Sequence, residues 1–180
     1  REHFEKRLFT HGFSGQLLIA KNGSIVFEKT MGFADMRTKD TLTANTPMHI
    51  ASVGKTFTSM AVLHLMEQGK LALDDTLGKF FPGFPYEGIT VKMLLSHRSG
   101  LPNYLHYLPN KDKTVCYRNE DVLNSLYNLH PNLERKPGTR FGYSNTNFVL
   151  LAMIVEKLTG EAFPAYMKKT FFEPNEPPAI

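Results

Sequence analysis

The amino-acid sequence predicts an α+β fold, with a β-hairpin near the amino end and helices through most of the remaining chain. Two apolar runs, GQLLIA and SIVFEKTMG, flank Lys-Asn-Gly, and an Asn-Gly pair between such runs is typical of a tight hairpin turn. Later segments repeat apolar residues at helical spacing. The 180 residues, 42% hydrophobic and 21% charged, have the composition of a globular protein.

The predicted strands come early in the chain. A short helix is expected to end near residue 10, and the hairpin to cover residues 16–32. Residues 33–46 are expected to form a loop, because polar and turn-forming residues dominate this segment and a proline follows it. The helical region is expected to cover residues 48–172.

Helices are predicted in several segments of that region. Residues 53–68 are expected to form a buried central helix, since apolar side chains cover more than one face and Gly69 follows as a stop signal. The sequence VKMLLSH predicts a short helix over residues 91–97, and the segments before and after it are expected to form turns and loops. Asn119, before two acidic residues, predicts a helix cap, and Pro131 predicts the end of that helix.

Two more helices are expected at the carboxyl-terminal side. The first is predicted because five apolar residues recur on one helix face, and it is expected to end at Gly160. These residues are Phe148, Leu151, Ala152, Val155 and Leu158. The second is expected to run to about residue 172. The proline-rich EPNEPPAI that follows is expected to form no regular structure.

Charge and composition argue against several classes of function. The net charge of +4 is spread along the chain in short clusters, so we expect no nucleic-acid partner. No apolar run is long enough for a membrane span, and no secretory leader opens the chain, so a signal peptide would already have been removed. Cys116 is the only cysteine, and the seven histidines lack ligand spacing. We therefore expect neither a metal nor a cofactor.

A serine and a lysine lie three positions apart in Ile-Ala-Ser-Val-Gly-Lys, at the start of the predicted helix 53–68. A serine hydroxyl needs a base and a positive environment to act as a nucleophile. The helix start supplies a positive field at Ser52, and the spacing places Lys55 on the same face. Gly54 between them leaves room for a substrate. The alternative is that Ser52 is only a helix cap.

A second polar motif, Phe-Gly-Tyr-Ser-Asn, occurs about ninety residues later, before another predicted helix. Tyr143 carries a phenol that can relay a proton if a neighbouring cation lowers its pKa. Asn145 offers an amide to orient Lys55 or a substrate, and the Tyr-x-Asn spacing places both side chains on one side of the turn. His97 follows Ser96 directly, and because adjacent side chains diverge, we do not expect catalysis by His97.

Together these motifs resemble the serine β-lactamase and penicillin-binding-protein family, in the branch of class C β-lactamases, D-alanyl-D-alanine carboxypeptidases and related esterases. The resemblance is carried by MHIASVGKTFTSMAVLHLMEQGKLALDD, ITVKMLLSHRSGLPNY and KPGTRFGYSNTNFVLLAMIVEKLTG. Together with the opening hairpin, these stretches cover about residues 14–174. It implies that Ser52 is the acylated nucleophile, Lys55 its proton partner and Tyr143 the general base. Asn145 would orient the substrate.

The resemblance also implies parts that this chain does not contain. The family has a third motif, Lys-Thr-Gly or His-x-Gly, on a late strand, and no such motif occurs here. We therefore expect residues 1–180 to be the amino-terminal portion of a β-lactamase/transpeptidase-like domain, without its carboxyl-terminal strands. A missing segment or a second chain is expected to cover the incomplete sheet, and residues 1–180 alone are expected to be poorly active.

The expected function is serine hydrolysis through an acyl-enzyme, with a β-lactam, a D-Ala-D-Ala peptide or an ester as the small-molecule or peptide substrate. The alternatives are a penicillin-recognising sensor, an inactive binding relative, and a helical structural protein in which the motifs arise by chance. By resemblance, the protein is expected to be periplasmic or secreted in a bacterium.

Overall fold

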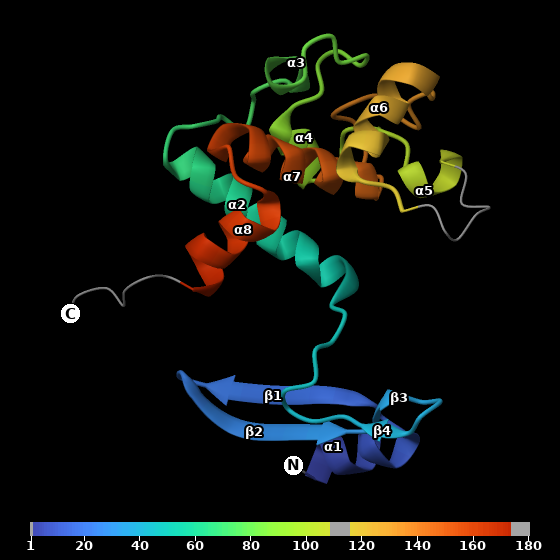
Figure 1. Cartoon of the computed structure of the whole chain (residues 1–180), viewed down its shortest axis with the longest axis vertical. Coiled ribbons are helices and arrows are strands. Elements are labelled where there is room, and N and C mark those ends of the chain that lie inside the picture. Colours follow the sequence, from blue (N-terminus) through green and yellow to red (C-terminus); the bar gives the residue numbers. More distant parts are fainter. Residues whose placement is uncertain (1, 109–115, 174–180) are drawn as a thin grey trace. The chain divides into compact units, whose positions relative to one another are not determined.

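The computed structural model describes residues 2–108 and 116–173, and Figure 1 shows the order of its helices and strands. The chain divides into two compact units, Arg1–Ile50 and Ala51–Ile180, which we describe separately. The first holds the strands and the second holds most of the helices. The prediction that both belong to one partial domain stays a prediction.

The first unit contains the predicted hairpin. After helix α1 (Glu2–Arg7) and the 3₁₀ turn η1 (Phe9–His11), strand β1 (Gly15–Lys21) pairs with the antiparallel strand β2 (Ser24–Met31). The turn residues Asn22 and Gly23 have φ values of 50° and 77°. Two positive φ values match the twist of a two-residue hairpin, which is why Asn-Gly is favoured there.

The expected loop 33–46 is partly wrong, because it contains a second, smaller hairpin of strands β3 (Phe33–Asp35) and β4 (Asp40–Thr41). The polar residues that suggest a loop in fact form its turn: the Asp35 carboxylate accepts a hydrogen bond from the Arg37 N–H at 2.7 Å. Asp side chains form such turns readily. Gln16 of β1 donates to the Thr43 carbonyl at 2.7 Å, which ties the segment to the first hairpin.

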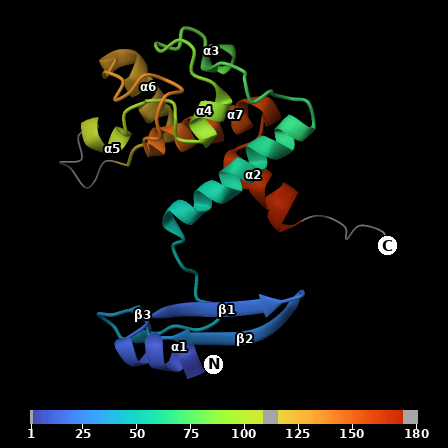
Figure 2. The same ribbon diagram turned by 180° about the vertical axis from the view of Figure 1, so that it is seen from behind.

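The second unit is built around one long helix, α7 (Asn145–Thr159), which packs against α2, α4, α5, α6 and α8 (Figures 1 and 2). The other elements of this unit are η2 (Ala51–Val53), α2 (Gly54–Glu67), α3 (Leu77–Phe80), α4 (Val91–Leu95), α5 (Tyr104–Tyr107), α6 (Asn119–Leu129), α8 (Phe163–Met167) and the π-helical turn η3 (Lys168–Phe172). Residues 150–155 of α7 are all buried.

Helix 53–68 is therefore not the buried centre that its apolar residues suggest. Its counterpart α2 buries one face, with Ala61, Val62 and Leu65 in the core, whereas Met60 and Leu63 remain 45% and 43% exposed. The physical reason is that an apolar stripe shows which face prefers burial, but the number of neighbouring helices decides whether the whole helix is enclosed. In this unit it is α7, rather than α2, that several neighbouring helices enclose.

Other helix limits differ in detail. Helix α6 begins at Asn119, so Asn119 is not its cap; instead, the Asp121 carboxylate accepts the Arg118 N–H at 2.7 Å. Short helices α3 and α5 lie in segments that were expected to be turns. Helix α7 ends before Gly160, whose φ of 70° gives the expected left-handed stop. No described helix is long and apolar enough to span a membrane.

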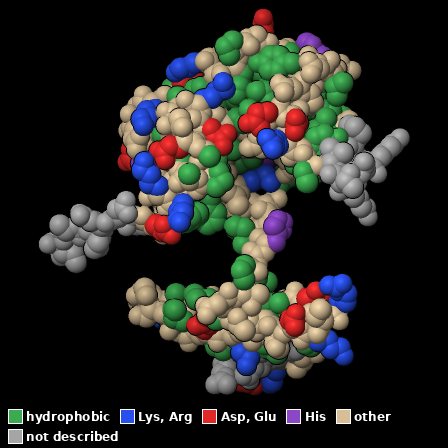
Figure 3. Space-filling model, viewed as in Figure 1, with side chains coloured by type: hydrophobic (Ala, Val, Ile, Leu, Met, Phe, Trp, Pro, Cys, Tyr) green, Lys and Arg blue, Asp and Glu red, His purple; other side chains and the backbone are tan. Residues whose placement is uncertain are grey.

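Two loops of the helical unit are held together beside the start of α7. The Gly100 carbonyl accepts from the Glu134 N–H at 2.9 Å, and the His97 carbonyl accepts from the Gly142 N–H at 2.7 Å. These backbone bonds fix the segment that leads to Tyr143. On the face shown in Figure 3, acidic and basic side chains are interspersed over the helical unit.

We predict that Gly100→Ala destabilises the helical unit much more than Gly88→Ala. Both glycines have positive φ values, 76° and 72°, so each substitution carries a backbone cost of about 1–2 kcal/mol. A Cβ at position 100 would also overlap the Arg135 carbonyl oxygen, whereas nothing lies near a Cβ at position 88. Urea unfolding followed by helical circular dichroism should give losses above about 3 kcal/mol for Gly100→Ala alone. Equal losses would contradict the close approach.

Candidate active site

Ser52 lies in the 3₁₀ turn η2, directly before α2. Its Oγ is 2.8 Å from the Tyr143 hydroxyl and accepts a hydrogen bond from Lys55 Nζ at 3.1 Å. The cap position of α2 belongs to Val53, and no side chain caps this helix. The alternative that Ser52 serves only as a helix cap is therefore wrong, because its hydroxyl contacts two of the other predicted site residues, Lys55 and Tyr143.

Lys55 stands in the first turn of α2, on the same side as Ser52. Its Nζ lies 5.1 Å from the centre of the Tyr143 ring and 5.8 Å from that of Phe148. A cation over an aromatic face is attracted by the ring quadrupole, so these rings help to hold the ammonium beside the hydroxyl of Ser52. The predicted i, i+3 neighbourhood of serine and lysine is thus present.

Tyr143 and Asn145 come from the loop that enters α7, and their side chains lie together as the Tyr-x-Asn spacing predicts. The Tyr143 hydroxyl donates to Asn145 Oδ1 at 3.3 Å. The amide of Asn145 in turn donates to Asn103 Oδ1 at 3.5 Å. Asn145 was expected to orient Lys55 or a substrate; the contacts present here are with Tyr143 and Asn103, and the substrate role stays a prediction.

These contacts define the direction of the hydrogen bonds at Ser52. The lysine ammonium can only donate, so Ser52 Oγ accepts from Lys55. The phenol of Tyr143 donates to Asn145, which leaves its oxygen free to accept the proton of Ser52. With that arrangement of donors, the 2.8 Å contact lets the hydroxyl of Ser52 donate to the Tyr143 oxygen, along the line on which a base would remove its proton.

The environment lowers the pKa of the Tyr143 phenol. Hydrogen bonding with Lys55 is the largest cause, hydrogen bonding with Ser52 and the positive charge of Lys55 add to it, and partial desolvation opposes them. A cation beside a phenol favours the phenolate. Tyr143 thus reaches its basic form at a lower pH than an ordinary tyrosine. The Tyr143 side chain is 44% exposed, so solvent reaches it.

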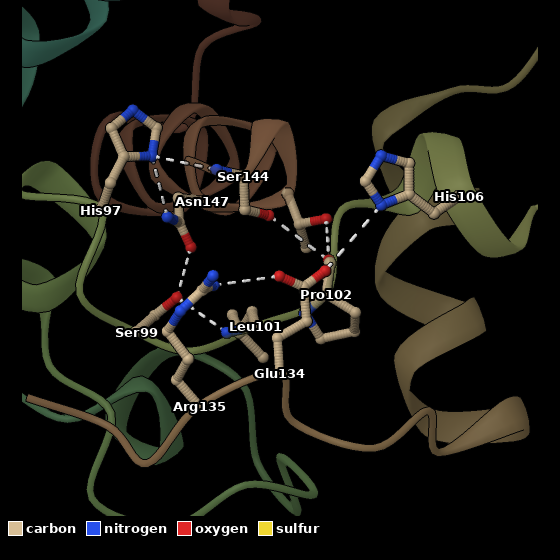
Figure 4. Close-up of polar contacts among 10 residues, drawn as sticks. His97, Ser99, Leu101, Pro102, His106, Glu134, Arg135, Ser144 and Asn147 are labelled. Carbon is tan, nitrogen blue, oxygen red and sulfur yellow. Dashed lines mark hydrogen bonds and ion pairs between the residues drawn. The ribbon is translucent and has the colours of Figure 1, made fainter. Parts of the chain in front are cut away.

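The loop 99–103 anchors the amino end of α7 (Figure 4). The Pro102 carbonyl accepts from Ser144 Oγ at 3.3 Å and from Thr146 Oγ1 at 2.7 Å. Deeper in the fold, Ser99 donates to the amide oxygen of the fully buried Asn147 at 2.6 Å. The sequence analysis did not single out Asn147. An amide side chain among the apolar residues of a buried helix is nevertheless a signal, because a buried amide needs a specific hydrogen-bond partner.

The surroundings of the site leave space beside the start of α2. A side chain built at Gly54 would meet nothing within 4 Å, in agreement with the expectation of room beside the nucleophile. Within residues 2–108 and 116–173 no group of three acidic, histidine or cysteine side chains is placed to hold a metal ion. Cys116 is a free, exposed thiol.

Comparisons with known proteins identify a family and several relatives of this chain. A family model described as Beta-lactamase matches residues 1–176. Penicillin-binding protein 4* of Bacillus subtilis is 36% identical over 165 residues, which are 91% of this chain and 37% of that protein. This chain spans about a third of the length of the curated relatives that it matches.

Solved structures also match. The D-amino acid amidase of Ochrobactrum anthropi SV3, crystallised with L-phenylalanine, superposes with a TM-score of 0.80 at 26% identity, over 92% of this chain and 46% of that one. EstCE1, a hydrolase with promiscuous acyltransferase activity, superposes with a TM-score of 0.79 at 25% identity, over 96% of this chain and 50% of that one. The predicted β-lactamase/transpeptidase-like fold is confirmed, with a small part of the sheet present.

We predict that Lys55→Met raises the pKa of Tyr143 towards its ordinary value of about 10. The reason is that the substitution removes the donor and the charge that favour the phenolate. Absorbance titration of each protein, with its Tyr143→Phe version subtracted, isolates this phenol. Lys79→Met is the matched control, because Lys79 pairs with Asp75. An unchanged Tyr143 titration in Lys55→Met would show that Lys55 is not the cause.

Proposed function

This chain belongs to the β-lactamase family, and from that premise we propose that Ser52 is the nucleophile of a serine hydrolase that works through an acyl-enzyme. The observation that carries the proposal is the contact chain from Lys55 to Ser52 to Tyr143, which joins two motifs ninety-one residues apart in the sequence. The resemblance of this chain to the family also supports these roles for Ser52, Lys55 and Tyr143.

In the proposed acylation step, the Tyr143 phenolate takes the hydroxyl proton of Ser52 while Ser52 Oγ attacks the carbonyl carbon of the substrate. The bond from that carbon to the leaving nitrogen or oxygen then breaks, and the leaving group takes the proton from Tyr143. Lys55 stabilises the phenolate and the developing negative charge with its ammonium. Once Tyr143 has taken the proton, its hydroxyl can donate to Asn145 Oδ1, and Asn145 contacts the substrate.

Deacylation reverses the proton path. Tyr143 removes a proton from a water molecule, the water oxygen attacks the acyl carbon, and the bond to Ser52 Oγ breaks as Ser52 regains a proton. The backbone N–H of Ser52 would supply one donor to the oxyanion, and by family resemblance the second comes from a strand after the third motif. Because losing one donor typically costs about 10²–10³ in rate, we propose that residues 1–180 alone are poorly active.

The proposed substrate is a β-lactam, a D-Ala-D-Ala peptide or an ester. The name of the Bacillus subtilis relative refers to penicillin binding, and that of the Ochrobactrum anthropi neighbour to amides of D-amino acids. All three substrates present an acyl carbon to one serine and differ in leaving group and pocket shape. The second candidate is a penicillin-recognising sensor that acylates without turnover; burst acylation with no further product would identify it.

We also propose that further polypeptide covers the exposed face of α2, from a continuation of the chain or from a second chain. The support is that Met60 and Leu63 stay exposed on that helix. Apolar side chains grouped on one face favour a covering surface. A periplasmic or secreted location is proposed, since the relatives with penicillin-binding names are bacterial.

A fluorophosphonate probe should label Ser52 and no other serine, because Ser52 is the serine whose hydroxyl lies against a tyrosine of lowered pKa. Intact mass and peptide mapping give the site of the adduct. Ser52→Ala should abolish labelling. Ser96→Ala is the matched control and should label normally, since Ser96 follows α4 and its hydroxyl donates to the backbone carbonyl of Lys92. An adduct on Ser96 or Ser144 would refute the proposal.

Tyr143→Phe should slow the labelling of Ser52 by about 10²–10⁴-fold, the usual cost of losing a general base. The variant keeps the ring that packs beside Lys55 and removes only the hydroxyl. Tyr127→Phe, which loses a hydroxyl bonded to the Pro82 carbonyl, is the control and should label at the original rate. If Tyr143→Phe reacts as fast as the parent, the base is Lys55 rather than Tyr143.

A further inference from the structure

His97 adopts an uncommon backbone conformation beside the candidate site. It follows α4 with φ at 53°, in the left-handed region where glycine is usual. A residue with a side chain costs about 1–2 kcal/mol more there. Such a conformation persists where the surrounding contacts require it, so the contacts of the imidazole are informative.

Two hydrogen bonds meet at one nitrogen of the imidazole, as Figure 4 shows. The backbone N–H of Ser144 donates to His97 Nδ1 at 3.2 Å, and Asn147 Nδ2 lies 3.1 Å from the same nitrogen. A backbone N–H can only donate, so Nδ1 carries no proton. The neutral ring therefore holds its proton on Nε2.

A buried chain of hydrogen bonds supports this assignment. The Leu101 N–H donates to Ser99 Oγ at 3.1 Å, and Ser99 Oγ donates to Asn147 Oδ1 at 2.6 Å. The amide oxygen of Asn147 thus faces Ser99, and its NH₂ group faces His97. Ser99 is 1% exposed and Asn147 is fully buried, so neither can turn to water without losing these partners.

The face of the same ring lies against the proposed base. The centres of the His97 and Tyr143 rings are 4.5 Å apart with a tilt of 31°, and Phe148 lies 5.1 Å away. Burial and the nearby charge of Lys55 lower the pKa of His97, while the hydrogen bond with the Ser144 backbone opposes them. A protonated ring would lose both accepted hydrogen bonds and would add a second cation beside Lys55 and Tyr143.

We infer that His97 is the positioning residue of Tyr143: its neutral imidazole holds the peptide after Tyr143 through Nδ1 and supports the phenol ring with its face. It does not touch the substrate; it acts by keeping the phenol oxygen beside Ser52 and Lys55. The expected effect on the labelling rate of Ser52 rests on the proposed function. The expected effect on the pKa of Tyr143 does not, because that pKa can be measured directly.

The test compares His97→Gly with His97→Asn in the 180-residue chain. Glycine relieves the positive φ and removes the side chain, so any loss reports the imidazole rather than backbone strain. Asparagine tolerates the same φ and offers Oδ1 as an acceptor in place of Nδ1. His106→Asn is the matched control, because His106 is exposed and lies near Glu134 rather than Tyr143.

Nuclear magnetic resonance of protein carrying ¹³C at the tyrosine Cζ atoms reports the pKa of Tyr143, assigned with Tyr143→Phe. We expect His97→Gly to raise this pKa and to slow the labelling of Ser52 by about 10²-fold, as a displaced catalytic group does. His97→Asn should recover part of both effects, and His106→Asn should change neither. Imidazole ¹⁵N shifts should show Nδ1 without a proton at neutral pH.

Three results would overturn the inference: a Tyr143 pKa that His97→Gly leaves unchanged, identical behaviour of His97→Asn and His97→Gly, or a proton on Nδ1 at neutral pH. If Ser52 of the parent is not labelled at all while His97→Gly raises the pKa of Tyr143, the positioning role stands and the proposed hydrolase function fails. The two claims are thereby separated.

Discussion

The hydrogen bond between Ser52 Oγ and the Tyr143 hydroxyl, 2.8 Å long, is the interaction on which the site depends. It joins the turn before α2 to the loop before α7, and each partner is a weak reagent alone. A serine holds its proton too tightly to attack a carbonyl, and an ordinary phenol is protonated at neutral pH. In contact, and with Lys55 beside both, the serine has an acceptor for its proton and the phenol has a lowered pKa.

The helical unit maintains that short contact by placing its two longest helices against each other. The buried faces of α2 and α7 meet in the core. Ser52 in the turn before α2 and Lys55 in its first turn thereby lie beside Tyr143, which precedes α7. The bonds that join the loops 97–100 and 134–142 limit movement of the backbone before Tyr143. A rigid support of this kind matters, because displacement of a catalytic group by about 1 Å can cost 10²-fold in rate.

Several features could be predicted from the sequence because they are local. The hairpin follows from Asn22-Gly23, whose positive φ values suit a two-residue turn. The neighbourhood of Ser52 and Lys55 follows from helical spacing. The central helix was assigned wrongly, because apolar residues in 53–68 and in α7 look alike in sequence. Only the arrangement of the other helices encloses α7 and leaves Met60 and Leu63 of α2 exposed.

By itself, the sequence determined the α+β class, the family resemblance and the candidate residues Ser52, Lys55, Tyr143 and Asn145, since these depend on residue type and short spacing. Tertiary structure decided how the distant ones meet: that Tyr143 contacts Ser52, and that His97 lies against the phenol. The physical reason is that a hydrogen bond or ring contact needs a separation of a few ångströms, and spacing along a chain sets such distances only within one turn or one hairpin.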